Sequence, residues 1–193
     1  MIDDIIILDD FICKQYQDDI EQNLVGDSRL PWYIQDDVTV SFADVPNKNF
    51  GLSHVLKNDH GVISNLYQLV IPMVYTAMDK VGYRVTNVFL ARSFLQVPST
   101  NNKPNRAHTD LPFAHTVCLY YVNDSEGDTV LYTETSDDVH SNDINTHQFT
   151  EYQRVTPKKG RAVIFNGNRF HSSSCPTTNK RCILNFDLNV ELK

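Results

Sequence analysis

The second half of the chain contains a series of short segments rich in β-branched and aromatic residues, separated by clusters of turn-forming residues. This pattern is typical of antiparallel strands. We expect six of them, at residues 84–97, 115–122, 128–134, 150–155, 160–166 and 180–190. A succession of strands of this kind folds as a β-sandwich or a jelly-roll barrel.

The first half of the chain has a different residue pattern, which includes helical segments. A first strand is expected within 4–12, a helix over 13–26 that ends at Gly26, and a second helix over 61–80, with a polar loop and a short strand (37–42) between them. The prediction is therefore a mainly β fold with N-terminal helices (α+β), a jelly-roll barrel braced by helices. We expect a single domain over 1–193, in which 1–83 support a barrel core formed by 84–193, because no repeat or linker divides the chain.

Composition limits the function classes. The 193 residues carry a net charge of −7, which argues against broad nucleic-acid binding and leaves a small-molecule or peptide substrate. The four cysteines are scattered, and the acidic N-terminus is unlike a signal peptide, so we expect a protein of the reducing cytoplasm. No apolar segment is long enough to cross a membrane, so we expect no membrane insertion. The sequence does not indicate an oligomeric state.

The histidines separate into two groups. Four lie in polar or capping contexts and are expected at the surface: His54, His60, His140 and His147. Three remain near strand ends, namely His108, His115 and His171.

His108 and Asp110 are two residues apart, which places both side chains on one side of an extended segment. A single His-x-Asp motif of this kind is also common at ordinary strand edges, where it binds no metal. His171, however, follows the glycine-led strand 160–166 and a turn, and two strand ends of an antiparallel barrel can meet at one mouth. Two imidazoles and one carboxylate on one face of a metal are the arrangement of non-haem Fe(II) oxygenases. We therefore expect His108, Asp110 and His171 to bind a metal ion.

Arg181 begins the last strand. If that strand alternates regularly, Arg181, Ile183, Asn185, Asp187 and Asn189 share one face, and an apolar set beginning at Cys182 packs on the other. An arginine that lines a barrel needs an anion, because an unpaired buried charge is costly. A guanidinium pairs with a carboxylate in a bidentate fork, so we expect a carboxylate ligand inside the barrel.

The order HxD, a long gap, His and an arginine ten residues later resembles the Fe(II)/2-oxoglutarate-dependent oxygenases, most closely their prolyl-4-hydroxylase-like branch, over roughly residues 84–190. The segments "HTVCLYYVND", "EGDTVLYTE" and "PKKGRAVIFNGNRFHSS" carry the likeness. It implies a double-stranded β-helix in which the HxD pair and His171 bind Fe(II). It further implies that Arg181 and Tyr121 hold the far carboxylate of 2-oxoglutarate. The implied reaction hydroxylates an unactivated carbon of a prolyl or other peptide side chain, or of a free amino acid, and releases succinate and CO2. Ascorbate is an optional accessory of such a reaction.

Two departures from that pattern leave questions open. The strand before HxD lacks the tyrosine found in many relatives, and either Arg92 or Gln96 is the polar substitute. The nucleic-acid demethylases of the family carry a second arginine near the end of the last strand, where this chain has Asp187 and Asn189, which speaks against a nucleic-acid substrate. The loops 98–107 and 135–149 are either lids or disordered segments. Other readings are a cupin-like metal enzyme that does not use 2-oxoglutarate and a catalytically silent binding domain.

Overall fold

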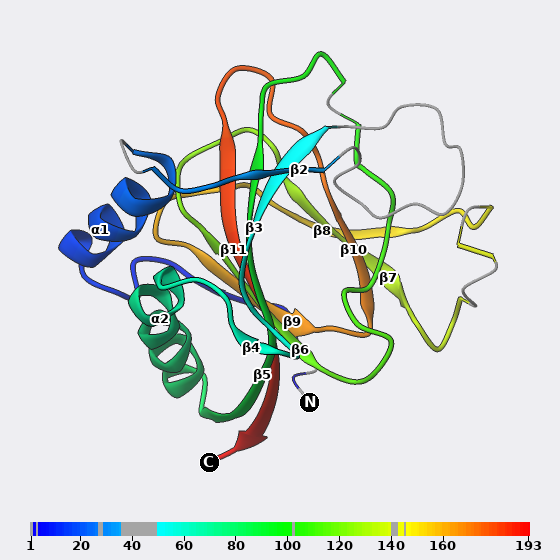
Figure 1. Ribbon diagram of the computed structural model, residues 1–193. Coiled ribbons are helices and arrows are strands. Elements are labelled where there is room, and N and C mark those ends of the chain that lie inside the picture. The colour runs from blue at the N-terminus through cyan, green and yellow to red at the C-terminus, as the bar shows by residue number, and fades with distance from the viewer. Residues whose placement is uncertain are drawn as a thin grey trace.

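A computed structural model describes residues 2, 4–26, 29–35, 50–101, 103–139, 143–144 and 146–193. The strand expected at 37–42 and His140 lie outside the described residues. Two helices and two antiparallel sheets make up the described part of the chain (Figure 1).

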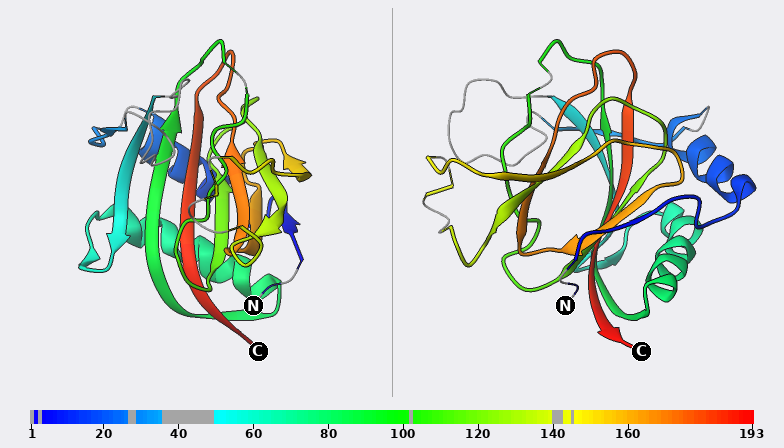
Figure 2. Two further views of the ribbon diagram at one scale, coloured as in Figure 1. Left: turned by 90° about the vertical axis from the view of Figure 1, so that its right-hand side faces the viewer. Right: turned by 180° about the vertical axis from the view of Figure 1, so that it is seen from behind.

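The larger sheet has eight strands. Their order across the sheet is β1 (Ile6–Leu8), β9 (Ala162–Asn166), β6 (Thr116–Tyr121), β11 (Arg181–Leu192), β5 (Tyr83–Gln96), β3 (Gly51–Asn58) and β2 (Tyr33–Gln35), with β4 (Gly61–Val62) paired to β3. The smaller sheet has the order β10 (Arg169–Ser173), β7 (Thr129–Thr135) and β8 (Glu151–Val155). The long strands β5 and β11 run side by side, as the views of Figure 2 show.

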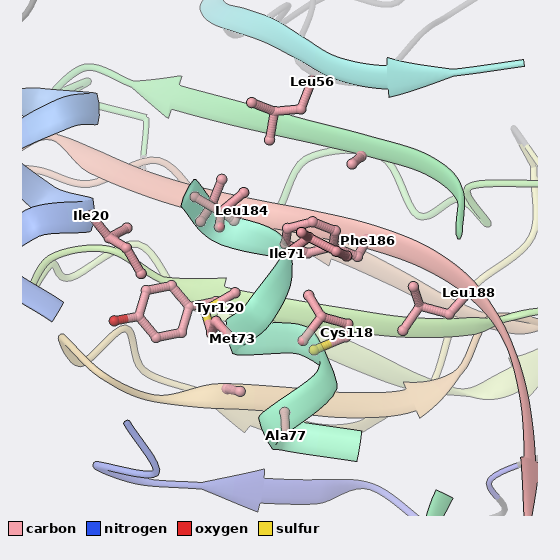
Figure 3. Packing of buried hydrophobic residues seen from close by; sticks show 14 of the residues in the cluster. Ile20, Leu56, Ile71, Met73, Ala77, Cys118, Tyr120, Leu184, Phe186 and Leu188 are labelled. Atoms are coloured by element: carbon pink, nitrogen blue, oxygen red, sulfur yellow. The ribbon is translucent and has the colours of Figure 1, made fainter. Parts of the chain in front are cut away.

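Both helices lie on the side of the larger sheet that faces away from the smaller one (Figure 1). They are α1 (Lys14–Val25) and α2 (Leu66–Lys80). Buried residues of α2 recur at helical spacing, for example Val70, Val74 and Ala77, which gives the helix one apolar face. Figure 3 shows this face packed against side chains of β6 and β11.

Strand β11 is buried on both faces, and its alternation decides what each face contacts. Leu184 and Phe186 point to the helix-side core, whereas Ile183 belongs to a second core between the two sheets. The face that begins at Arg181 therefore lies inside the barrel, as the sequence pattern predicts. The smaller sheet closes this interior, so the molecule has the predicted double-stranded β-helix with supporting helices.

The six strands predicted in the second half are all present, within a few residues of the expected bounds. Several elements differ from the predictions, among them the unexpected short strands β2 and β10. The helix expected over 61–80 begins only at Leu66, because Gly61 and Val62 pair with β3. Strand β3 itself was not expected, and it buries His54, whose Nδ1 bonds to the Pro31 carbonyl; the surface prediction for His54 is therefore wrong.

Candidate active site

The backbone brings His108 and His171 together. They form an isolated antiparallel bridge in which each backbone N–H donates to the other's carbonyl over 3.0 Å. Upstream, the Asn105 N–H donates to the Ser173 carbonyl, so the segment before HxD runs along β10 as a further strand of the barrel wall. The end of the loop 98–107 is thus part of the wall.

The three expected ligands converge. One donor atom from each of His108, Asp110 and His171 lies within 4.8 Å of the other two, and Nε2 of His171 is 3.3 Å from Oδ2 of Asp110. The Nδ1 atoms of the histidines lie 3.1 Å and 3.3 Å from the carbonyls of Arg106 and Arg169. A carbonyl only accepts, so Nδ1 carries the proton in each ring and the Nε2 lone pair faces the cluster.

The charges of the cluster suit a divalent cation. Burial and the neighbouring His171 lower the pKa of His108 to about 4, so its imidazole is neutral at pH 7. Burial alone would raise the pKa of Asp110, but the neighbouring His171 and the charge of Arg92 outweigh it and hold the pKa well below 3.8. One carboxylate and two imidazoles form the donor set of a non-haem Fe(II) site.

Arg181 is buried, with 2% of its surface exposed. Its Nε donates to the Gly127 carbonyl at 2.6 Å, Nη1 to Oε1 of Gln96 at 3.0 Å and Nη2 to Oγ1 of Thr129 at 2.8 Å. A guanidinium has five N–H donors, so each terminal nitrogen keeps one for another partner. No carboxylate among the described residues forms an ion pair with it, and the cation lacks a counter-charge.

One cavity of about 460 Å³ joins the two features. All three metal-ligand candidates line it, and so does Arg181. Its remaining lining comes mostly from β3, β5, β10 and β11 and includes Leu52, Ser53, Val55, Phe94, Ser172, Ser173, Ile183 and Asn185. The cavity has a metal-ligand cluster and an unpaired guanidinium on its walls, which suits a small carboxylate ligand that also reaches a metal.

The two residues that the sequence left as alternatives, Arg92 and Gln96, both line the cavity, but at different points of it. The β5–β11 register pairs Gln96 with Arg181 and Arg92 with Asn185. Gln96 accordingly contacts the guanidinium of Arg181, whereas Arg92 bonds to Asp110 at the metal end of the cavity, over 2.6 Å.

Tyr121, expected to contact the cosubstrate, lies behind Arg181. Its hydroxyl is 2.8 Å from Oγ1 of Thr129, to which it donates, and the residue does not line the cavity. Thr129 does line it, and sequence reasoning missed this residue. The Tyr121 hydroxyl also lies 3.2 Å from the Val155 carbonyl, so its one proton is shared between these two acceptors, while the Thr129 oxygen accepts from Nη2 of Arg181.

Two further buried groups stand behind the metal-ligand candidates. Asp187 is 0% exposed, and its Oδ1 lies 3.8 Å from Nε2 of His115. The alternation of β11 was the available signal for Asp187, because it put this carboxylate on the interior face with Arg181.

No protein-family model and no curated protein sequence matches the chain. Solved structures do. An α-ketoglutarate-dependent epimerase, SnoN from nogalamycin biosynthesis, superposes with a TM-score of 0.64 at 11% identity, over 99% of this chain and 81% of that one. A Pseudomonas putida prolyl-4-hydroxylase gives 0.58 at 12%, over 96% and 92%. The chain has the fold of these enzymes.

A third match adds a peptide-bound example. The Trichoplax adhaerens prolyl hydroxylase, in complex with a hypoxia-inducible-factor peptide, gives a TM-score of 0.58 at 14% identity, over 95% of this chain and 82% of that one. At such identities the likeness establishes the double-stranded β-helix fold, and the activity has to be argued from this chain's own residues. Among the described residues, no helix has the length and apolar character that a membrane crossing requires.

Proposed function

We propose that this protein is an Fe(II)- and 2-oxoglutarate-dependent oxygenase. The observation that carries the proposal is the single cavity with the His108–Asp110–His171 cluster on one wall and the unpaired Arg181 guanidinium on another. A metal cluster alone suits many enzymes. The buried guanidinium beside it would pair with a second carboxylate on a ligand that already chelates the metal, and 2-oxoglutarate is such a ligand.

In this proposal each side chain has a defined task. The two Nε2 atoms and Asp110 hold the ion, and the two fixed Nδ1 protons keep the rings in the orientation that ligation requires. Arg181 and the Thr129 hydroxyl bind the far carboxylate, with Gln96 and Tyr121 holding these two groups in place. When bound, iron and 2-oxoglutarate would supply the oxidising chemistry, with succinate and CO2 as products.

The remaining lining favours oxidation of a carbon centre shielded from water. Phe94, Leu119 and Ile183 give the cavity apolar walls between the metal cluster and Arg181. For the substrate we propose a peptide side chain, prolyl or another, or a free amino acid, hydroxylated at an unactivated carbon. The likeness to a peptide-bound prolyl hydroxylase supports the first option and the likeness to SnoN, a natural-product enzyme, supports a small molecule.

The two other readings leave features unused. A cupin-like enzyme without 2-oxoglutarate has no task for Arg181, and a silent binding domain has none for the two imidazoles whose rings are oriented toward the cluster. Both predict that 2-oxoglutarate fails to stabilise the protein in the presence of Mn(II). A thermal-shift measurement without oxygen therefore separates them from the oxygenase, because a ligand that binds only the folded state raises its stability.

Turnover is the direct test. With Fe(II), oxygen and 2-oxoglutarate, the wild-type protein should release succinate, and His108→Ala and Asp110→Ala should abolish this release. His60→Ala is the matched control, since the His60 side chain is 82% exposed and away from the cavity lining. Succinate release by the His108 and Asp110 variants at the wild-type rate would refute the proposed metal site.

A further inference from the structure

The two oxygens of the Asp110 carboxylate have different partners. Oδ1 accepts from Nη2 of Arg92 at 2.6 Å. Oδ2 accepts from Nδ2 of Asn185 at 3.2 Å and lies 3.3 Å from Nε2 of His171. Oδ2 is therefore the oxygen next to the imidazole cluster, while Oδ1 is bound to the guanidinium of Arg92, which also lines the cavity.

Arg92 is itself fixed. Its Nη2 is also 3.4 Å from Oδ2 of Asp187, and its guanidinium lies 5.1 Å from the ring centroid of Phe94. Asp187 is completely buried, so it ties the guanidinium to the centre of β11 rather than to a mobile surface group.

His115 packs beside Asp187 without a hydrogen bond to it. Nε2 of His115 lies 3.8 Å from Oδ1 of Asp187, and neither atom has a hydrogen-bond partner among the described residues. The His115 ring is fixed by a 2.7 Å hydrogen bond from Nδ1 to the Phe113 carbonyl, and Gly167 makes room for it, because a Cβ at this position would lie only 2.2 Å from Nε2 of His115. This packing keeps the Asp187 carboxylate beside the Arg92 guanidinium.

We propose that Arg92 is a positioning residue that makes Asp110 a one-oxygen ligand. This inference rests on the proposed function. With Oδ1 held by the guanidinium, the metal receives Oδ2 alone, and three of six coordination positions stay open for a chelating cosubstrate and oxygen. A carboxylate free to turn would offer both oxygens, as carboxylates do at other metal centres, and would occupy one of those positions.

A different use of the same groups is a second metal ion, because donor atoms of Asp110, His115 and Asp187 also lie within 4.8 Å of one another. Arg92 speaks against it. Its guanidinium already provides a positive charge within 2.6 Å and 3.4 Å of the two carboxylates, and a divalent ion beside it would be strongly repelled. The account therefore predicts one metal ion per chain.

Mn(II) is the probe for the test. Electron paramagnetic resonance gives the affinity and stoichiometry, and water-proton relaxation counts the exchangeable waters on the bound ion. The wild-type protein should bind one ion with three waters. Arg92→Met should bind the ion with one water fewer, because the freed Oδ1 becomes a second oxygen ligand. Arg92→Lys keeps a charged donor and should recover part of the lost water number.

Arg84→Met is the matched control. Arg84 is on the same strand, but its side chain is 69% exposed and pairs with Glu191, so both readings should equal the wild type. Arg92→Met leaves Asp187 buried without its cation, and the double variant Arg92→Met/Asp187→Leu covers the case in which the single variant does not fold. It should show the same loss of one water.

The outcomes are distinct. Failure of the wild-type protein to bind Mn(II), or binding unaffected by His108→Ala, would overturn the proposed function. Wild-type binding that depends on His108, together with an unchanged water number in Arg92→Met and in Arg92→Met/Asp187→Leu, would overturn the positioning role alone. A second Mn(II) ion would show that the Asp187 cluster is a metal site instead.

Discussion

Replacement of Arg181 by Met tests the link between the cavity and its ligand. The change keeps a long side chain but removes one of the two arginines among the described lining residues, the one that is not bonded to the metal-ligand candidate Asp110. It also removes the donors to Gly127, Gln96 and Thr129, so some loss of stability is expected without any ligand. The informative quantity is therefore the change in ligand affinity rather than the stability of the free protein.

The expected size follows from the donor count. Three of five N–H groups are engaged, which leaves two for a carboxylate. Hydrogen bonds to charged groups contribute about 1.5–3 kcal/mol each, so their loss costs about 3–6 kcal/mol, or roughly 10²- to 10⁴-fold in Kd. At a 2-oxoglutarate concentration about 100 times Kd, the wild type gains about 2.7 kcal/mol and about 5–11 °C in Tm. The variant should gain about 0.4 kcal/mol or less, which is about 2 °C at most.

The assay is a thermal melt with Mn(II) and either 2-oxoglutarate or 2-oxobutyrate, which lacks the far carboxylate. Wild-type protein should bind 2-oxoglutarate at least about 100-fold more tightly, whereas Arg181→Met should bind the two acids almost equally. Arg154→Met, at a 40% exposed arginine paired with Glu151, is the control. A variant that still prefers 2-oxoglutarate by the wild-type ratio would refute the role of Arg181.

Further predictions concern packing and burial. Gly127→Ala places a Cβ 2.5 Å from the Ser174 carbonyl oxygen, so it should lower the unfolding free energy measured in urea by about 1–3 kcal/mol and weaken 2-oxoglutarate binding. Wild-type values of the unfolding free energy and of the affinity would contradict this close packing. Iodoacetamide at pH 8 should label exposed Cys13 but neither Cys118 nor Cys182, because burial raises the pKa of the latter two thiols to about 12. Labelling of Cys118 or Cys182 in the native protein, detected by mass spectrometry, would contradict this prediction. These thiols ionise in the unfolded chain near pH 9 but not in the folded one, so their contribution to the unfolding free energy should be constant below about pH 9 and fall as the pH rises toward 12. An unfolding free energy that does not fall above about pH 9 would argue against their burial.

Local sequence patterns were sufficient for the barrel and for much of the site. The alternation along β11 sorted Leu184 and Phe186 to the core and Arg181 to the interior, because a strand buried on both faces still points successive side chains in opposite directions. The HxD spacing and the turn before His171 likewise predicted a convergence that the His108–His171 backbone bridge produces.

What the sequence did not contain was the pairing between distant strands. Strand β3, Gly51–Asn58, has weak local strand character and exists because β5 and β2 bond to its two edges. The separate positions of Arg92 and Gln96 depend on the β5–β11 register, which no local pattern specifies. The contact of Arg92 with Asp110 depends on that register and on the chain's return past β5, and it became visible only in three dimensions.

A crystal grown without oxygen in Mn(II) and 2-oxoglutarate would test the central claim most directly. The account predicts one anomalous-scattering peak, which marks an ion coordinated by Nε2 of His108, Nε2 of His171 and a single oxygen of Asp110. 2-Oxoglutarate should reach from this ion to Arg181. A peak at other residues, or a ligand whose far carboxylate avoids the guanidinium, would contradict it.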